Sequence, residues 1–191
     1  MEPGGLEAKY IRESHSALMG HIADRKYSLR IRIAATAIGL FGAALGVSVV
    51  LSIGGDAFDM MHGAVVSGET IPVHRRYWMS AGMLSLLAVF GVTWKASLVV
   101  AAPFWPALAE YDGRNSIQFS PDEDDTAEKL AARGRYRIEA ALRRGTIAAG
   151  RRFDPADFLR QESIRVRWMW FALAIVVMLI SVWLFQRAAQ P

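Results

Sequence analysis

The chain of 191 residues is 53% hydrophobic and only 21% charged, and it contains no cysteine. Soluble domains carry a charge on roughly a quarter of their residues. The composition is therefore unusual for a single soluble domain. It excludes a disordered tail, a collagen-like fibre and a disulfide-stapled secreted module. It leaves a small multi-pass membrane protein with one modest polar portion.

Three long apolar runs predict helices that cross a membrane. The first, Ile33 to Ile53, carries no charged side chain, and at roughly 1.5 Å per residue its length matches a hydrocarbon core of about 30 Å. The second and third runs, Trp78 to Trp94 and Trp168 to Phe185, have tryptophan near both ends, where its amphipathic ring favours the membrane–water interface. The rest of the chain is too short to bury three such helices as a soluble core. We therefore expect an all-α membrane protein with three transmembrane helices, an N-terminal amphipathic helix and a helical cytoplasmic loop.

The predicted segments follow directly from these runs. In chain order they are a cytoplasmic amphipathic helix at 1–30, a transmembrane helix at 31–53, an external loop at 54–76, a second transmembrane helix at 77–101, a helical cytoplasmic region at 102–167, a third transmembrane helix at 168–186 and an external tail at 187–191. The first run exceeds the roughly 7–15 apolar residues of a signal peptide, so we expect it to stay in the mature chain as an anchor.

The distribution of Lys and Arg predicts the orientation. Most of the 22 basic residues fall in 1–32 and 102–167, and few fall in 54–76 or the C-terminal tail. Because basic residues accumulate on the cytoplasmic side, we expect the N-terminus in the cytoplasm and the C-terminus outside, across an inner or plasma membrane of bacterial type.

Two segments flank the first span. Leu6, Tyr10, Leu18, Ile22 and Leu29 recur mostly at spacings of four and seven, which is typical of an amphipathic helix. It would lie near the inner leaflet or run into the first span, as an interfacial anchor or as a partner-binding helix. The glycine-rich external segment reads as a loop. The loop also contains possible soft metal ligands, but their spacing matches no metal signature: Met60, Met61, His62 and His74.

The cytoplasmic region is expected to be helical. Pro103 and Pro106 should end the second span, and a turn-like stretch follows, made of Asp112, Gly113, Asn115 and Ser116. A helix should begin near Ser120 and Pro121, with the acidic residues 122–125 favouring the positive end of its dipole rather than forming a metal site. Its apolar face would hold Leu130, Ile138 and Leu142, and it would end at Gly145 or Gly150.

A second helix start is predicted at Asp154, the cap, and Pro155, the first helical position. No Gly or Pro follows until Pro191. We therefore expect one continuous helix that enters the third span and couples it rigidly to the cytoplasmic region.

No catalytic or nucleotide-binding motif occurs, and no Asp or Glu lies within a span, which argues against a proton relay. We expect no enzymatic activity and no cofactor or metal. The basic balance points to the bilayer and its anionic headgroups rather than to nucleic acid. The basic residues assigned to the interface are Arg25, Lys26, Arg30, Lys95, Arg165 and Arg167. Lys95 would snorkel to the headgroups; the alternative is an intramembrane charge with a partner.

A stripe of small residues in the first span predicts close helix packing, since small side chains let helices approach in lipid. The stripe consists of Ala35, Gly39, Gly42, Ala43 and Gly46. It would face another membrane subunit or a second copy, or else this chain's own second or third span.

These features favour a non-catalytic accessory or assembly subunit of a multi-protein inner-membrane complex, such as secretion, conjugation, respiratory or transport machinery. The alternatives are a self-assembling membrane effector or pore controlled by its cytoplasmic region, and a small membrane enzyme acting on lipid.

Overall fold

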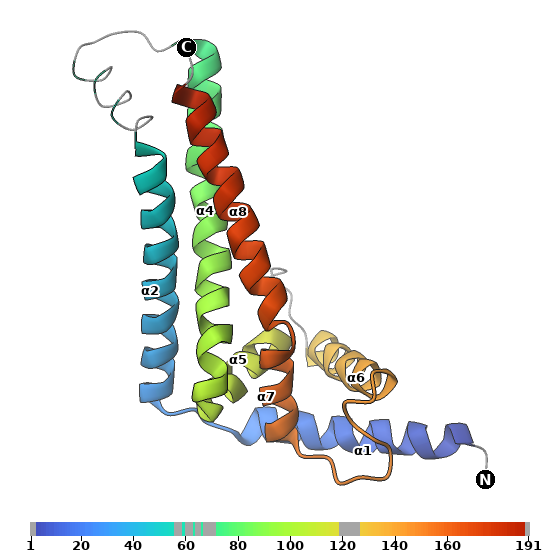
Figure 1. Cartoon of the computed structure of the whole chain (residues 1–191). Coiled ribbons are helices and arrows are strands. Elements are labelled where there is room, and N and C mark those ends of the chain that lie inside the picture. Colours follow the sequence, from blue (N-terminus) through green and yellow to red (C-terminus); the bar gives the residue numbers. More distant parts are fainter. Residues whose placement is uncertain are drawn as a thin grey trace. The chain divides into compact units, whose positions relative to one another are not determined.

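The computed structural model describes residues 3–55, 72–118 and 127–189, together with the single residues 59, 63 and 66. The regular elements of these ranges are all helical, which confirms the predicted fold class (Figure 1). The chain forms two compact units. Unit 1 consists of Met1–Arg32 and Ala102–Arg165, and unit 2 consists of Ile33–Ala101 and Val166–Pro191.

Unit 2 contains the three apolar helices. They are α2 (Leu29–Ile53, from Ile33 onward in unit 2), α4 (Val73–Ala101) and α8 (Arg167–Ala189). Each belongs to a helical stretch long and apolar enough to cross a membrane. The protein is therefore a membrane-embedded, multi-pass protein, as the three uncharged runs predict.

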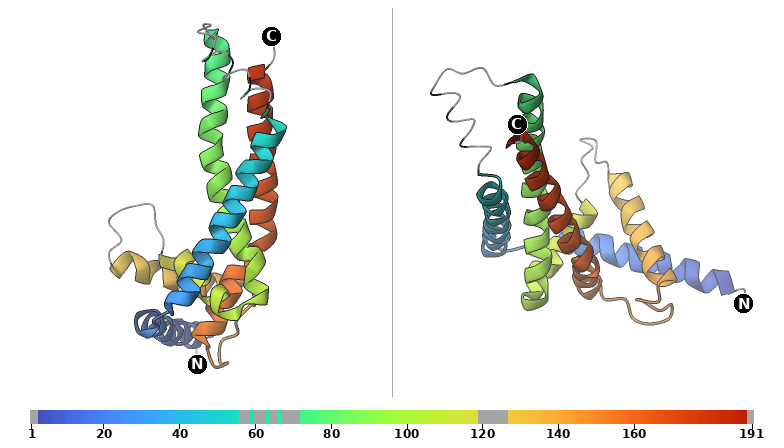
Figure 2. Two further views of the ribbon diagram at one scale, coloured as in Figure 1. Left: turned by 90° about the vertical axis from the view of Figure 1, so that its left-hand side faces the viewer. Right: turned by 45° about the horizontal axis from the view of Figure 1, so that its top comes forward.

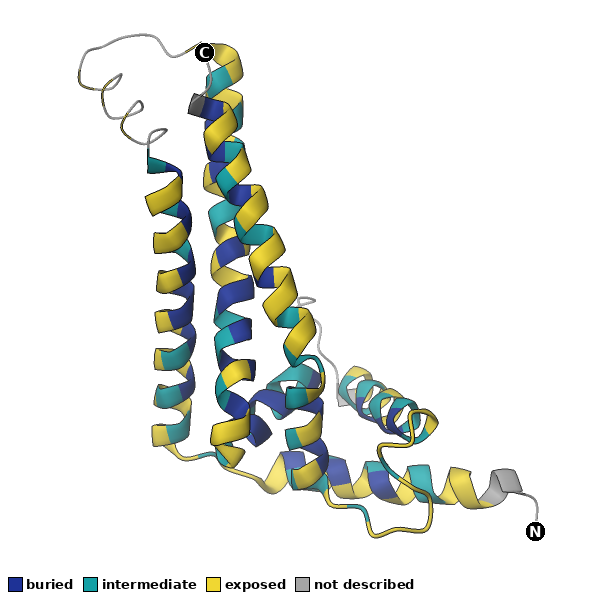
Figure 3. Ribbon diagram, in the orientation of Figure 1, coloured by how far each residue is buried: buried dark blue, intermediate teal, exposed yellow. Residues whose placement is uncertain are grey.

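The helices of unit 2 pack through narrow faces. α4 and α8 run side by side (Figure 2), and Val92 and Ala96 of α4 meet Ala174 of α8. A second cluster joins all three helices, and its buried residues are Val50, Met79, Val89, Phe185 and Ala188. The buried residues of α2 form one stripe, and its other sides are exposed (Figure 3). Most of the apolar surface of unit 2 is thus left for contact with lipid or with other chains.

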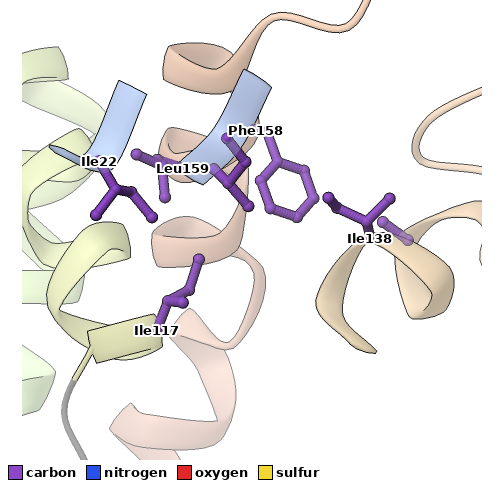
Figure 4. Close-up of a cluster of buried hydrophobic side chains, with 7 residues drawn as sticks. Ile22, Ile117, Ile138, Phe158 and Leu159 are labelled. Atoms are coloured by element: carbon purple, nitrogen blue, oxygen red, sulfur yellow. The ribbon is translucent and has the colours of Figure 1, made fainter. Parts of the chain in front are cut away.

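Unit 1 is a small helical module. Its elements are α1 (Pro3–Asp24), the 3₁₀ turn η1 (Ala102–Phe104), α5 (Pro106–Gln118), α6 (Ala127–Arg143) and α7 (Pro155–Arg165). Side chains from all four α-helices meet in its core (Figure 4), which consists of Leu18, Ile22, Ile117, Ile138, Ala141, Phe158 and Leu159. Each large aliphatic side chain buried there contributes about 1.5–3 kcal/mol. Leu130 and Leu142 pack against this core, as the predicted apolar face of α6 requires.

The predicted helix ends in this module are confirmed where the structure describes them. The Asp154 carboxylate accepts hydrogen bonds from the N–H groups of Ala156 (2.9 Å) and Asp157 (3.3 Å), and Pro155 opens α7. α6 ends before Gly145, whose φ of 71° lies in the left-handed region that glycine adopts most easily. The N–H groups of Gly145 and Thr146 bond the carbonyls of Leu142 and Ala141, as in a Schellman cap.

The predicted turn at Asp112, Gly113, Asn115 and Ser116 is wrong, because these residues lie inside α5. Pro106 opens this helix instead of only ending the previous one. Gly113 allows the backbone of α7 to approach, since a Cβ at this position would lie 2.7 Å from the carbonyl carbon of Leu159. The local sequence does not distinguish a glycine that allows two helices to cross closely from a glycine in a turn.

Of the two courses expected for the N-terminal helix, the structure shows a helix separate from the first span, because α1 ends at Asp24 and α2 begins at Leu29, with a non-helical connection at residues 25–28. The helix expected to run without a break from Pro155 into the third span is interrupted. α7 and α8 are separated by one turn residue, Val166, where the chain passes from unit 1 to unit 2. The acidic residues 122–125 and the residues Met60, Met61 and His62 lie outside the described residues, and His74 lies in the first turn of α4.

Candidate functional site

Buried Glu110 is the centre of a polar cluster in unit 1. It lies one turn into α5 and is 5% exposed. Its Oε1 lies 2.9 Å from Nε2 of His21 and 3.4 Å from Nε of Arg25, and it accepts a hydrogen bond of 3.0 Å from the phenol of Tyr27. One carboxylate oxygen thus contacts side chains from the end of α1 and from the connection that follows it.

A second set of contacts, from Arg114 and Tyr111, also fixes the connection to α5. Arg114 donates from Nη1 to the carbonyl oxygen of Arg25 at 2.9 Å, and its guanidinium lies 5.4 Å from the centre of the Tyr27 ring. The edge of Tyr111 completes the contact, with 5.3 Å between the two ring centres. The cluster holds the α1–α2 connection on α5.

Tyr27 acts here as a hydrogen-bond donor. Burial of its phenol raises the pKa of Tyr27 well above the ordinary range, and the negative charge of Glu110 and the hydrogen bond to it raise the pKa further. The neighbouring Arg114 and Arg25 oppose this change with smaller effects. The phenol therefore stays protonated at neutral pH and keeps its bond to Glu110.

A second buried carboxylate, Glu162 of α7, gathers three arginines. Its Oε1 lies 3.1 Å from Nη2 of Arg144, and its Oε2 lies 3.4 Å from Nη1 of Arg137 and 3.3 Å from Nη2 of Arg165. Glu162 is 7% exposed, whereas each arginine side chain is about a third exposed. This cluster ties α6 and its C-terminal cap to α7.

Asp112 and Ser163 form a third link between helices of unit 1. The Ser163 hydroxyl donates to Oδ2 of Asp112 at 2.7 Å, and both residues are buried. Taken together, the buried acidic side chains of α5 and α7 each join one helix to another. The arrangement can position helices with high specificity, because an unpaired buried charge would be costly.

The small-residue stripe of the first span faces α4 of the same chain. All of its members, Ala35, Gly39, Gly42, Ala43 and Gly46, are buried in the structure. A Cβ on Gly39 would overlap the Trp94 ring, one on Gly42 would overlap the Ser97 side chain, and one on Gly46 would overlap Thr93. Of the two expected contacts for the stripe, the structure shows the one within this chain.

The basic residues assigned to headgroups fall in different surroundings. Arg25 belongs to the Glu110 cluster and Arg165 to the Glu162 cluster, while the Arg167 guanidinium lies 4.9 Å from the centre of the Trp168 ring. Lys26 and Arg30 are exposed in the α1–α2 region, and Lys95 is half-buried six residues before the end of α4.

Sequence reasoning missed the two acidic centres. Glu110 stands alone after an apolar stretch and Glu162 lies in an ordinary amphipathic helix, so neither has a local motif. The partners of Glu110 lie 83 and 89 positions away in the chain, beyond the reach of any periodicity. Among the described residues, no group of three or more His, Cys, Asp or Glu could hold a metal ion.

Comparison with models of known families, with curated proteins and with solved structures finds no match for this chain.

Proposed function

We propose that this protein is a non-catalytic accessory or assembly subunit of a multi-protein inner-membrane complex. The proposal rests on one observation, that the buried acidic side chains of unit 1 bond other parts of the same unit. Glu110, Glu162 and Asp112 are each bonded to partners on another element of the same module. A catalytic acid or base must reach its substrate, and these carboxylates are 7% exposed or less. Their surroundings suit a module that presents a fixed surface.

The apolar helices of unit 2 supply the second support. Only 17% of the most apolar window of the third spanning helix is buried within the chain, against 33% for each of the other two. Large side chains of α8 are exposed along its length: Trp168, Met169, Phe171, Leu173, Ile175, Val176, Leu179, Ile180 and Trp183. A face of this kind suits lipid and the helices of other membrane subunits.

The proposed location is the inner or plasma membrane, with the N-terminus and unit 1 in the cytoplasm and the C-terminus outside. The concentration of Lys and Arg in 1–32 and 102–167 supports it. Because the chain has no cysteine, single cysteines at exposed Ala148 and Val66 test it without background. In intact cells a membrane-impermeant maleimide should label Val66→Cys and leave Ala148→Cys unlabelled. The reverse pattern contradicts the orientation.

Purification of the full chain in mild detergent tests the subunit role. We expect a different membrane protein to co-purify in stoichiometric amount and to be lost in the double variant Val176→Trp/Ile180→Trp, which enlarges the exposed face of α8. The control is Phe41→Trp/Leu45→Trp on the exposed face of α2. A closed homo-oligomer would favour the self-assembling effector or pore, and an isolated monomer would contradict both roles.

A further inference from the structure

The Glu162 cluster carries more positive charge than its carboxylate can neutralise. Three guanidinium groups lie within 3.1–3.4 Å of one carboxylate, which leaves an excess of two positive charges in a half-buried place. Two other acidic side chains of α6 and α7 pair with different arginines. Glu139 pairs with Arg135 and Arg143, and Asp157 pairs with Arg160.

The three arginines retain donors for a second anion. Each guanidinium has five N–H groups in a planar fork, whereas Glu162 offers two oxygens. The side chains of Arg137 and Arg144 are 34% exposed and that of Arg165 is 28% exposed, so solvent and solutes reach them. A guanidinium group can donate two parallel hydrogen bonds to a phosphate group. One carboxylate does not use all the N–H donors, or neutralise all the charge, of three arginines.

The chain connects this cluster closely to the third span. Arg165 precedes Trp168 by three residues, so their Cα atoms are at most about 11 Å apart. Trp168 begins the apolar run and carries the Arg167 guanidinium over its ring at 4.9 Å, an arrangement suited to the headgroup level. Anionic headgroups on the cytoplasmic side attract basic residues next to a span.

We propose that Arg137, Arg144 and Arg165, held in position by Glu162, bind a phosphate group, supplied by an anionic lipid headgroup or by free phosphate. The excess of two charges matches a dianionic phosphomonoester. Phosphatidate should therefore bind more tightly than phosphatidylglycerol, and phosphatidylcholine should bind least. This site goes beyond the subunit role and does not depend on it.

Native mass spectrometry of the full chain with equimolar phosphatidate and phosphatidylcholine tests the site. The double variant Arg144→Gln/Arg165→Gln leaves one Arg137–Glu162 pair and should lower phosphatidate affinity about tenfold, the loss expected for charged hydrogen bonds. The control, Arg151→Gln/Arg152→Gln, removes the same charge from the exposed α6–α7 loop and should lower it less than about twofold. Equal losses in both variants, or no lipid preference in the wild type, would overturn the proposal.

Wild-type measurements keep the proposal testable if the cluster variant does not fold. Chloride at an ionic strength matched to the phosphate buffer should not displace phosphatidate, and its displacement by chloride would overturn the site. Lipid-free protein in neutral detergent separates the two sources. Broadening of the inorganic phosphate ³¹P signal identifies free phosphate as a ligand, and binding of phosphatidate alone identifies the headgroup. Binding of neither overturns the proposal.

Discussion

Gly113 of α5 lies so close to the backbone of Leu159 in α7 that a Cβ on Gly113 would stand 2.7 Å from the Leu159 carbonyl carbon. Backbone atoms cannot move aside as a flexible side chain can. The same crossing carries the buried Ser163–Asp112 hydrogen bond. The position of α7 on α5 therefore depends on a missing methyl group.

Gly113→Ala should destabilise unit 1 by about 1–3 kcal/mol, the usual cost of overpacking. Thermal unfolding of the detergent-solubilised protein, followed by circular dichroism, measures the change. Gly134→Ala in α6 is the matched control, because its Cβ would meet only side-chain atoms at 3.5 Å or more, and alanine favours a helix over glycine. A Gly113→Ala protein as stable as the wild type would contradict the close crossing.

Glu110→Gln should release the α1–α2 connection. The substitution keeps the side-chain volume but removes the charge that faces His21 and Arg25. Loss of a hydrogen bond to a charged group costs about 1.5–3 kcal/mol, and we expect faster amide exchange at residues 25–28.

Glu139→Gln supplies the comparison for this experiment. Glu139 forms surface pairs with Arg135 and Arg143 one turn away, and such pairs contribute about 0.3–0.5 kcal/mol. Amide exchange at residues 25–28 should not change in this variant. If both substitutions have the same effect there, Glu110 does not hold the connection.

Tyr27 should remain un-ionised at a pH where an ordinary phenol has lost its proton. Burial and the Glu110 carboxylate raise the pKa of Tyr27, and a free tyrosine has a pKa of about 10. At pH about 11 the folded wild type and Tyr27→Phe should therefore show the same tyrosinate absorbance. In denaturant the wild type should exceed the variant by one tyrosinate, and an excess already present in the folded protein would refute the assignment.

Gly42→Leu should force α2 away from α4, because even a Cβ at this position overlaps the Ser97 side chain. We expect a loss of about 3 kcal/mol, at the upper end of overpacking costs, measured by thermal unfolding in detergent. Gly91→Leu on α4 is the control, since nothing lies within 4 Å of its Cβ position. Equal stability of the two variants would exclude a tight α2–α4 contact.

Several elements follow from local sequence. The uncharged run from Ile33 to Ile53 has the length of a bilayer core. Asp154 and Pro155 open a helix because a short carboxylate caps free N–H groups and proline suits the first position. Gly145 ends one because it tolerates a positive φ. Each of these signals acts within a few residues.

Only the tertiary structure shows which distant segments the buried acidic side chains and the glycines contact. Glu110 meets His21 across 89 positions, and Gly113 reads as a turn until α7 is placed against it. The small residues around Gly42 predict a closely packed helix, and only the structure shows that this helix is α4. The physical reason is range: helix length, caps and apolarity are properties of adjacent residues, whereas burial of a charge or a close crossing depends on which distant segment arrives there.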